Sequence, residues 1–350
     1  MKYPSLQDFA TVLPQLGEFD AIIDVRSPAE FALDHLPGAI NCPVLDDEQR
    51  IKVGTLYKQL NSFEAKKVGA ALVAKNIGMH IEERFLAMPK DWKPLVYCWR
   101  GGNRSGAMAH VLARIGWPAI QLEGGYKAYR AHVSEALLVA PALQFKVICG
   151  TTGSGKSRLL EVLDAIGAQV LDLEQLAAHR GSVLGNLPSQ PQPSQKWFET
   201  QIWHKLRHFD PSRPVFVESE SKKVGQLRVP DALMDTMRQA PCVSLTLSRP
   251  NRVRLLMEDY HHFADSPATL NAQLDCLVKL HGRAKIDAWH DLANSGAMPA
   301  LVDELLVDHY DPAYLRSIDR NFLQFGTARV LALDDIAPGD FLAAAHALAD

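Results

Sequence analysis

The chain has 350 residues, a hydrophobic fraction of 47% and a formal net charge of −3. This length favours two domains, and the apolar content is sufficient for two hydrophobic cores, so a disordered protein is excluded. The near-neutral charge excludes a strongly basic nucleic-acid-binding protein, although local basic patches remain compatible with it. The N-terminus lacks the apolar segment of a signal peptide and no run of about 18 apolar residues occurs, so we expect a cytoplasmic protein without a membrane span.

The cysteines and histidines do not have the spacing of a metal site. The five cysteines are Cys42, Cys98, Cys149, Cys242 and Cys276. Their odd number, their wide spacing and the lack of a CxxC pair argue against a disulfide framework and a structural zinc site. The thirteen histidines show no metal-ligand spacing either, so we expect no metal centre built from these residues.

Strand-like and helix-like segments alternate in the first 136 residues, which is typical of a parallel-sheet α/β domain. The pattern predicts a helix over residues 5–13, with Ser5 as its cap, and a short buried strand over residues 20–25. Asp24 and Arg26 lie at the carboxyl end of that strand, where α/β proteins build their sites. Either these two residues brace a neighbouring loop or they form an ion pair at a surface turn.

A long helical pattern follows over residues 46–88. It is longer than the connection between two strands of such a domain requires. We therefore interpret it as an insertion that carries substrate contacts or meets the second domain. Strands are expected again at residues 93–97 and 119–122, with a helix between them.

The strand at residues 93–97 runs directly into a cysteine and a glycine-rich loop with two arginines. A helix is expected to begin between Asn103 and Ser105. The loop amides, the helix N-terminus and the two guanidinium groups all favour a thiolate over a thiol. The alternative is a small buried cysteine, but such a position needs neither paired glycines nor arginines. The candidate residues of this loop are Cys98, Arg100, Gly101, Gly102, Arg104 and Ser105.

This loop resembles the active loop of rhodanese domains and of the related cysteine phosphatases. Residues 24–31 and 35–41 resemble the rhodanese signature before the active loop, and residues 122–126 resemble the one after it. These flanking segments favour a rhodanese over a phosphatase. The resemblance implies that Cys98 carries sulfur or selenium as a persulfide-type anion.

A short linker over residues 137–143, broken by Pro141, precedes the second domain, which we place at residues 144–350. That domain opens with a strand, a glycine-rich motif and a helix, in the order that a phosphate-binding loop requires. Loop amides turn inward on a polyphosphate, Lys156 reaches its terminal oxygens, and Ser157 can ligate Mg²⁺. The motif consists of Gly150, Thr151, Thr152, Gly153, Ser154, Gly155, Lys156 and Ser157.

Further strands are expected at residues 169–171, 214–217 and 242–247. The carboxyl ends of such strands converge on the phosphate site of a doubly wound sheet, so Asp172, Glu174 and Glu218 are candidates for Mg²⁺ binding or proton transfer. The strand at residues 214–217 runs into Glu218, where the second NTPase motif usually has aspartate, which argues against ordinary ATP hydrolysis. After the last strand, three arginines either clamp a phosphoryl group or lie on a solvated helix face. They are Arg249, Arg252 and Arg254.

The rest of the second domain is mainly helical in this interpretation. Residues 196–209 mix aromatic and basic side chains, but their apolar positions have helical spacing, which favours a core helix over an RNA-binding segment. Residues 188–194 read as an extended loop. A long helical region is expected beyond residue 267, and a strand at residues 330–333 with a terminal helix closes the domain.

The order of motifs along the chain resembles the bacterial tRNA 2-selenouridine synthases. The resemblance covers nearly the full length and implies a rhodanese-like α/β domain over residues 1–136. A P-loop NTPase-like parallel-sheet α/β domain with a helical C-terminal part then follows. The resemblance also adds Arg180 to the candidate site residues. The shared motifs lie at residues 98–105, 124–128, 150–157, 172–182, 218–221 and 310–314.

The resemblance implies a transferase that replaces sulfur by selenium in 2-thiouridine at the wobble position of tRNA. Selenophosphate is the selenium donor, and the reaction runs through an S-geranylated intermediate made from geranyl diphosphate. A diphosphate leaving group suits the loop at residues 150–157 without a hydrolytic base, while Cys98 receives selenium and presents it as a nucleophile. A selenophosphate supply enzyme is a further partner that the resemblance implies.

Two other functions are compatible with the same motifs. The first is an ATP-dependent kinase or NTPase with a regulatory or sulfur-relay rhodanese domain, whose nucleotide turnover would depend on Lys156. The second is a non-enzymatic tRNA-binding or sulfur-relay module, in which replacing Cys98 by serine would leave the tRNA modification unchanged.

Overall fold

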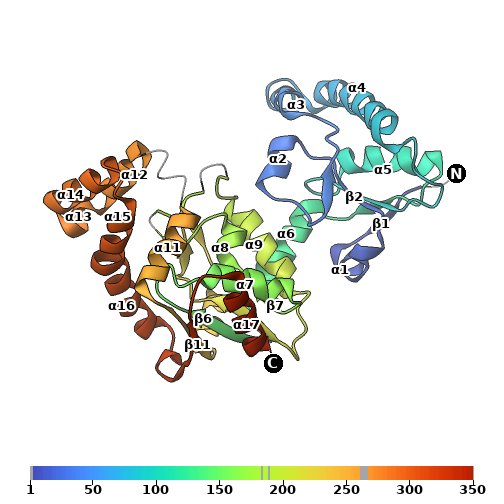
Figure 1. The fold of residues 1–350 in the computed structure, drawn as a ribbon. Helices are drawn as coiled ribbons and strands as arrows, with labels where there is room; N and C mark the ends of the chain where they lie inside the picture. Colours follow the sequence, from blue (N-terminus) through green and yellow to red (C-terminus); the bar gives the residue numbers. More distant parts are fainter. Residues whose placement is uncertain (1–2, 183, 188–189, 261–266, 350) are drawn as a thin grey trace. The chain divides into compact units, whose positions relative to one another are not determined.

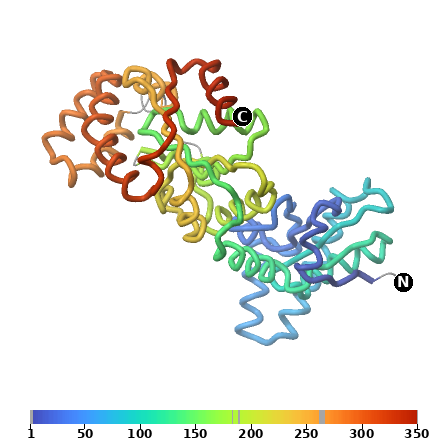
Figure 2. The backbone as a smooth tube through the Cα atoms, turned by 90° about the horizontal axis from the view of Figure 1, so that it is seen from below, coloured from blue at the N-terminus to red at the C-terminus, as the bar shows by residue number. Residues whose placement is uncertain are grey.

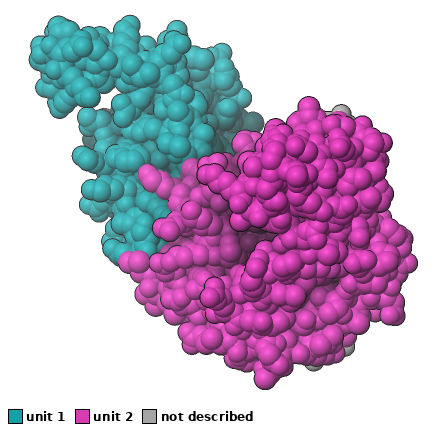
Figure 3. Space-filling view, turned by 90° about the vertical axis from the view of Figure 1, so that its left-hand side faces the viewer, with its two compact units in different colours: residues 1–136, 199–201 teal, residues 137–198, 202–350 magenta. Residues whose placement is uncertain are grey.

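A computed structural model describes residues 3–182, 184–187, 190–260 and 267–349 (Figure 1). The loop predicted at residues 188–194 therefore begins outside the described residues. The chain forms two compact units, shown in separate colours in Figure 3. The first comprises residues 1–136 and 199–201, and the second comprises residues 137–198 and 202–350.

The first unit is built on a parallel sheet of five short strands in the order β1-β5-β4-β2-β3. Apolar side chains of β2 and β4 are fully buried and pack with those of α5 in one hydrophobic core. This arrangement confirms the predicted parallel-sheet α/β class. The strands are β1 (Ser5–Gln7), β2 (Ala21–Asp24), β3 (Ala39–Asn41), β4 (Pro94–Tyr97) and β5 (Ile120–Leu122).

Two helices between β3 and β4 form an antiparallel hairpin, which corresponds to the insertion predicted over residues 46–88. Figure 2 shows this pair, in light blue, extending from the rest of the first unit. A short 3-10 helix (Leu13–Glu18) and one turn of π-helix (Ile81–Phe85) complete the unit. Its α-helices are α1 (Phe9–Val12), α2 (Pro28–Leu33), α3 (Asp47–Gln59), α4 (Ser62–His80), α5 (Asn103–Ile115) and α6 (Gly125–Ala136).

The predicted helix over residues 5–13 is wrong in its first part. Residues Ser5–Gln7 form β1, which pairs with β5 at the sheet edge, and α1 begins only at Phe9. The cap is Asp8, whose carboxylate accepts a hydrogen bond from the Thr11 amide at 2.7 Å. Pairing with a strand more than a hundred residues away thus overrides the local helix signal, because strand formation depends on tertiary context.

The second unit has its own parallel sheet of five strands in the order β12-β11-β6-β8-β7. The central strand β6 leads into the phosphate-loop motif, as the sequence predicts. A two-stranded antiparallel hairpin, β9 (Lys223–Val224) and β10 (Leu227–Arg228), follows β8. The five sheet strands are β6 (Gln144–Cys149), β7 (Gln169–Leu171), β8 (Pro214–Glu218), β11 (Cys242–Leu247) and β12 (Arg329–Leu333).

Helices cover both faces of this second sheet, each over its own hydrophobic core. On one face α7 and α17 lie side by side (Figure 1), and Phe341 of α17 is buried there. On the other face α9 buries Phe198 and Ile202, which confirms the predicted core helix. These helices are α7 (Lys156–Ala165), α8 (Leu173–Ala177), α9 (Gln195–Leu206), α10 (Asp231–Gln239) and α17 (Pro338–Ala349).

The predicted helical region after residue 267 is also present and has a separate core around Trp289. Short 3-10 segments (Asp275–Leu277 and Phe325–Thr327) and a π-helical turn (Leu306–Tyr310) connect its helices. Among the residues that the structure describes, none of the helices combines the length and the apolar character that crossing a bilayer requires. The helices of this part are α11 (Arg249–Asp259), α12 (Pro267–Leu274), α13 (Val278–His281), α14 (Arg283–Asn294), α15 (Met298–Leu305) and α16 (Asp311–Asn321).

Candidate functional site

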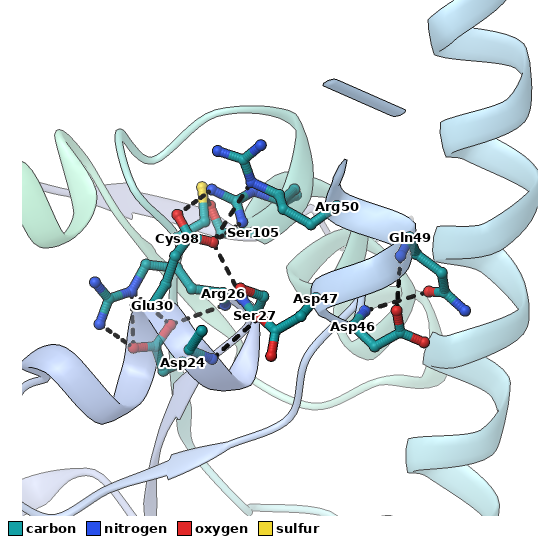
Figure 4. A network of polar contacts seen from close by, with 12 residues as sticks. Asp24, Arg26, Ser27, Glu30, Asp46, Asp47, Gln49, Arg50, Cys98 and Ser105 are labelled. Carbon is teal, nitrogen blue, oxygen red and sulfur yellow. Dashed lines mark hydrogen bonds and ion pairs between the residues drawn. The ribbon is translucent and has the colours of Figure 1, made fainter. Parts of the chain in front are cut away.

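Cys98 directly follows β4 and lies before the N-terminus of α5, so the positive end of the helix dipole faces this loop. Gly102 is the N-terminal cap residue of α5. Cys98 itself is buried, with 4% of its surface exposed. The Ser105 hydroxyl, from the first turn of α5, donates a hydrogen bond to the Cys98 sulfur at 3.2 Å (Figure 4). The loop therefore supplies both a helix dipole and a hydroxyl donor to stabilise a thiolate.

A second glycine loop, after β5, holds the Cys98 loop in position. Gly101 and Gly125 have φ values of +64° and +57°, a region that other residues rarely adopt. A Cβ on Gly125 would lie 2.2 Å from the Cys98 carbonyl oxygen, so the two backbones meet too closely for any side chain. The Tyr126 amide donates to that same carbonyl at 2.8 Å. The two loops thus form one backbone unit around the thiol.

Asp24 and Arg26 form a buried ion pair, with 2.6 Å between Arg26 Nη2 and Asp24 Oδ2 (Figure 4). Both side chains are almost fully buried, which excludes the alternative of an ion pair at a surface turn. The Arg26 guanidinium lies over the ring of Tyr126 at 4.0 Å from its centroid. Because the Tyr126 amide binds the Cys98 carbonyl, the ion pair braces the residue that holds the cysteine loop.

Arg104, in the first turn of α5, forms an ion pair with the Glu30 carboxylate. Its Nη1 atom lies 2.7 Å from Glu30 Oε2, and Arg50 approaches the same carboxylate at 3.6 Å. Burial opposes ionisation of Glu30, but the hydrogen bond and charge of Arg104 prevail and lower the pKa of Glu30. Within the described ranges, no hydrogen bond or ion pair joins Arg100 or Arg104 to the Cys98 thiol. That these two guanidinium groups favour the thiolate through their charge stays a prediction.

The predicted phosphate loop connects β6 to α7 in the second unit. Gly153 and Gly155 adopt left-handed φ values of +77° and +90°, which turn the loop into the first turn of α7. Lys156, at the start of α7, donates to the Gly150 carbonyl at 2.7 Å. A cavity of about 660 Å³ opens over the loop and is lined by Thr152, Gly153, Gly155, Lys156 and Ser157 among others. Its size and amide-rich base suit a diphosphate or a nucleotide.

Two of the three predicted carboxylates line this cavity. Glu174 accepts a hydrogen bond from the Ser157 hydroxyl at 3.1 Å, and Asp172 caps α8 through the Gln175 amide. Burial raises the pKa of Asp172 to about 6, and the nearby charge of Glu174 adds to the rise. Glu218 is 2% exposed and binds the Glu174 amide at 2.8 Å. Glu218 therefore positions Glu174 and does not itself line the cavity.

The three arginines after β11 do not clamp a ligand as a group. Arg249 and Arg254 form exposed ion pairs with Asp303 and Asp335. Arg252 is buried, and its guanidinium donates to the Thr152 carbonyl and binds Asp311 at 2.6 Å. Both predicted alternatives are thus wrong for Arg252, which fixes the phosphate loop to the start of α16.

Arg180 lines the cavity, as expected of a site residue. It donates to the Asp259 carbonyl at 2.6 Å and lies 4.7 Å from the ring centroid of Tyr260. The cavity also contains two residues that sequence reasoning missed, Tyr314 and Glu220. The Tyr314 hydroxyl accepts a hydrogen bond from the Gly150 amide at 2.6 Å. Its position in the motif at residues 310–314 is the sequence signal by which it could have been found.

A second, apolar pocket adjoins the cavity above the phosphate loop. The two share residues Thr152, Ser182, Leu256, Tyr260 and Tyr310. The sequence did not indicate which residues form such a pocket, because they come from distant segments of the helical part. The other lining residues are Leu184, Met257, Leu270, Met298, Leu301, Val302, Leu305 and Leu306.

Comparisons with protein families agree with this division into two sites. Residues 10–132 match the rhodanese-like domain family. Residues 143–276 match the family described as the tRNA 2-selenouridine synthase AAA domain. The first match contains the Cys98 loop, and the second contains the phosphate loop and its carboxylates.

Several curated proteins named tRNA 2-selenouridine synthase are similar to this chain. The Nitrosomonas europaea protein is 37% identical over 68% of this chain and 63% of its own length, and the Shewanella denitrificans protein is 38% identical over 68% and 65%. The Alcanivorax borkumensis protein is 36% identical over 84% of this chain and 88% of its own length. The matched part thus spans slightly less than two thirds of the first two relatives and most of the third. With both domain families in the same order, the chain belongs to the tRNA 2-selenouridine synthase family.

Proposed function

We propose that this protein is a transferase that replaces the sulfur of 2-thiouridine in tRNA by selenium and so produces 2-selenouridine. Family membership over both units supports this function. The observation that carries it is the pair of adjoining cavities at the phosphate loop, one polar and one apolar. The two cavities match the charged and the apolar ends of a prenyl diphosphate.

The finer proposal concerns the substrates. The base is 2-thiouridine at the wobble position, selenophosphate donates the selenium, and a selenophosphate supply enzyme is the partner that delivers it. The cytoplasm, where tRNA is modified, is the proposed compartment. The cysteine loop supports selenophosphate as donor because its helix N-terminus attracts an anion.

The third substrate that we propose is geranyl diphosphate. Its diphosphate lies at Lys156 and the loop amides, and its isoprenoid chain points past Thr152 and Tyr260 toward the apolar pocket. That pocket has a volume of about 50 Å³, so it holds part of the chain and must widen to take all of it. Burying the apolar chain contributes about 0.8 kcal/mol for each CH₂ group, so the pocket adds to affinity for this substrate over a bare diphosphate. A loop that stabilises a departing diphosphate needs no water-activating base, which agrees with the buried, hydrogen-bonded state of Glu218.

The proposed chemistry has two steps. First, the thiouridine sulfur bonds to C1 of the geranyl group, the C–O bond to diphosphate breaks, and the N3 proton of the base is released. Second, selenium from selenophosphate bonds to C2 of the base, the geranyl thiolate leaves, and water takes the phosphoryl group to give phosphate. Selenium keeps its oxidation state, so neither step needs an oxidant or a reductant. We assign Lys156 to the first step. In the second step the Cys98 loop holds the selenophosphate anion next to C2 of the base, and no sulfur–selenium bond forms at Cys98, because that bond would require an oxidant.

Mg²⁺ fits the oxygen donors next to the phosphate loop. The Ser157 hydroxyl and the Glu174 carboxylate lie 3.1 Å apart and are ligands of the kind that Mg²⁺ prefers. Across the described residues, no set of three or more His, Cys, Asp or Glu side chains is arranged to hold a metal ion. These two residues would therefore hold a Mg²⁺ that takes its remaining ligands from diphosphate and water, and the ion would offset charge on the diphosphate.

The test is nucleoside mass spectrometry of thiolated tRNA after incubation with the purified protein. With geranyl diphosphate alone we expect geranylthiouridine, and with selenophosphate added we expect selenouridine. ATP is omitted from both reactions. Failure to form either product without ATP, together with nucleotide turnover by the protein, would favour the kinase or NTPase function instead.

A further inference from the structure

The hairpin of α3 and α4 is fixed at its base and exposed at its tip. At the base, the Asn76 side chain donates to Gln49 at 2.7 Å and to the Val44 carbonyl at 3.0 Å. Helix α3 has no buried residue at all, although it is 13 residues long. At the tip, Tyr57 and Phe63 are 60% and 66% exposed. These two rings are not part of the hydrophobic core of the unit, so packing does not explain why aromatic residues occur at this position.

The same hairpin carries a strong local positive charge. Residues 47–80 contain six lysines and arginines and three acidic residues, a local net charge of +3, whereas the whole chain has a net charge of −3. Two of the acidic residues, Asp47 and Glu48, lie in the first turn of α3, so that Glu64 is the single acidic residue between positions 50 and 75. All six basic side chains are exposed. The Glu64 carboxylate pairs with Lys67, whose ammonium group also lies 5.1 Å from the ring centroid of Phe63. The basic residues are Arg50, Lys52, Lys58, Lys66, Lys67 and Lys75.

The basic surface begins next to the cysteine loop. Arg50, in the first turn of α3, lies 3.6 Å from the Glu30 carboxylate, which also binds Arg104 of the loop (Figure 4). Trp99, adjacent to Cys98 in the chain, is 37% exposed. Within the first unit, the basic side chains of the hairpin therefore begin at the carboxylate that binds the cysteine loop.

We propose that this hairpin is an RNA-binding surface and that it holds the tRNA whose base is modified at Cys98. Lysine and arginine side chains bind phosphates, and exposed aromatic rings stack on unpaired bases. Charge complementarity favours RNA over a protein partner, because the exposed apolar side chains of the hairpin, Ile51, Tyr57, Leu60 and Phe63, are accompanied by six exposed cations. The inference rests on the proposed function, since it takes tRNA as the substrate.

The test compares two double variants of the full-length protein that remove the same charge. Lys58→Ala with Lys66→Ala removes two cations near the hairpin tip. Lys90→Ala with Lys279→Ala removes two exposed lysines elsewhere. Affinity for unmodified tRNA is measured by fluorescence anisotropy over a range of salt concentrations. We expect the tip variant to bind at least fivefold more weakly and to lower the salt slope by about 1.5, the value for two lost phosphate contacts.

A second pair of substitutions measures the contribution of base stacking separately from that of charge. Tyr57→Ala with Phe63→Ala should weaken binding about tenfold and leave the salt slope unchanged, because aromatic rings contact bases rather than phosphates. Alkylation of Cys98 should proceed at the wild-type rate in all variants, which shows that the first unit is folded.

The possible outcomes separate this inference from the proposed function. If the wild-type protein binds and modifies tRNA and the tip variant does so equally well, the hairpin is not the RNA-binding surface. If the tip variant binds tRNA normally but loses a protein partner, the surface binds protein instead and the inference is wrong. If the wild-type protein neither binds nor modifies tRNA, the proposed function itself fails.

Discussion

Ser105 donates its hydroxyl hydrogen to the Cys98 sulfur across 3.2 Å. A hydrogen bond to an anion is worth about 1.5–3 kcal/mol, so removing it by Ser105→Ala should slow alkylation of Cys98 by iodoacetamide about tenfold at pH 7. The measurement is mass spectrometry of the Cys98 peptide. Cys276 is exposed and provides an internal reference. An unchanged ratio of the two alkylation rates would mean that the hydroxyl does not stabilise the thiolate.

The two sites should differ in the product that their loss leaves behind. Lys156→Ala should reduce geranylation of thiolated tRNA about a hundredfold, because one well-placed donor to a departing diphosphate is worth about 3 kcal/mol. Cys98→Ser should leave geranylation intact, abolish selenouridine, and let geranylated tRNA accumulate. Nucleoside mass spectrometry of both reactions distinguishes these results. The two-step proposal is wrong if both variants show the same defect.

Gly125→Ala should inactivate the selenium step. The added Cβ would lie 2.2 Å from the Cys98 carbonyl oxygen and would strain a residue at φ +57°. We expect loss of selenouridine with geranylation retained, since the phosphate loop belongs to the other unit. Gly106→Ala is the matched control, because its Cβ would meet only the Gln121 side chain at 3.5 Å. Normal selenouridine formation by Gly125→Ala would show that the backbone contact is not required.

Asp172 should make stability depend on pH. Burial raises its pKa to about 6, so between about pH 4 and pH 6 the carboxyl group is protonated in the folded protein but ionised in the unfolded chain. Its contribution to the free energy of unfolding therefore falls as the pH rises from about 4 to about 6, and stays low above that. Asp172→Asn removes this loss and keeps a side chain suited to cap α8. Urea unfolding should show the variant more stable than wild type at pH 7.5 and nearly equal at pH 4; equal stability at both values would contradict this assignment.

Arg252→Ala should destabilise the second unit. The guanidinium is 7% exposed, and its loss leaves the Thr152 carbonyl and the Asp311 carboxylate without their partner. Breaking such a pair costs about 3 kcal/mol in the free energy of unfolding. Arg254→Ala, which removes an exposed ion pair with Asp335, should cost less than about 1 kcal/mol. Urea unfolding of the two variants measures the difference, and equal losses would argue against the bracing role of Arg252.

The sequence predicts most strands and the two glycine loops because their signals are local. The motif at residues 150–157 contains its own turn residues, its lysine and its flanking strand and helix. The failed helix at residues 5–13 shows the limit of such signals, since β1 exists through its pairing with β5. A strand of three residues carries too little periodicity to be distinguished from a helix start.

The contacts of the arginines could not be predicted for a related reason. Arg104 and Glu30 are 74 residues apart in the chain, and nothing in either segment indicates that they meet. Arg252 and Asp311 are 59 residues apart and come together only when α11 and α16 are packed. The apolar pocket depends in the same way on tertiary packing, because Thr152, Ser182 and Leu184 line it together with residues from positions 256 to 310. Sequence patterns identify these side chains as charged or apolar, but the tertiary fold decides what each one contacts.

The position of Phe341 has a consequence for the order in which the protein is made. A Cβ on Gly155 would lie 2.7 Å from the Phe341 ring, so α17 closes against the back of the phosphate loop. The edge strand β12, which pairs with β11 in the same sheet, likewise comes from the end of the chain (Arg329–Leu333). During synthesis the cysteine loop can complete its contacts once residue 136 has left the ribosome, because all of them lie in the first part of the chain. The phosphate loop begins at residue 150. It cannot make its contact with Phe341 until about two hundred further residues have been synthesised.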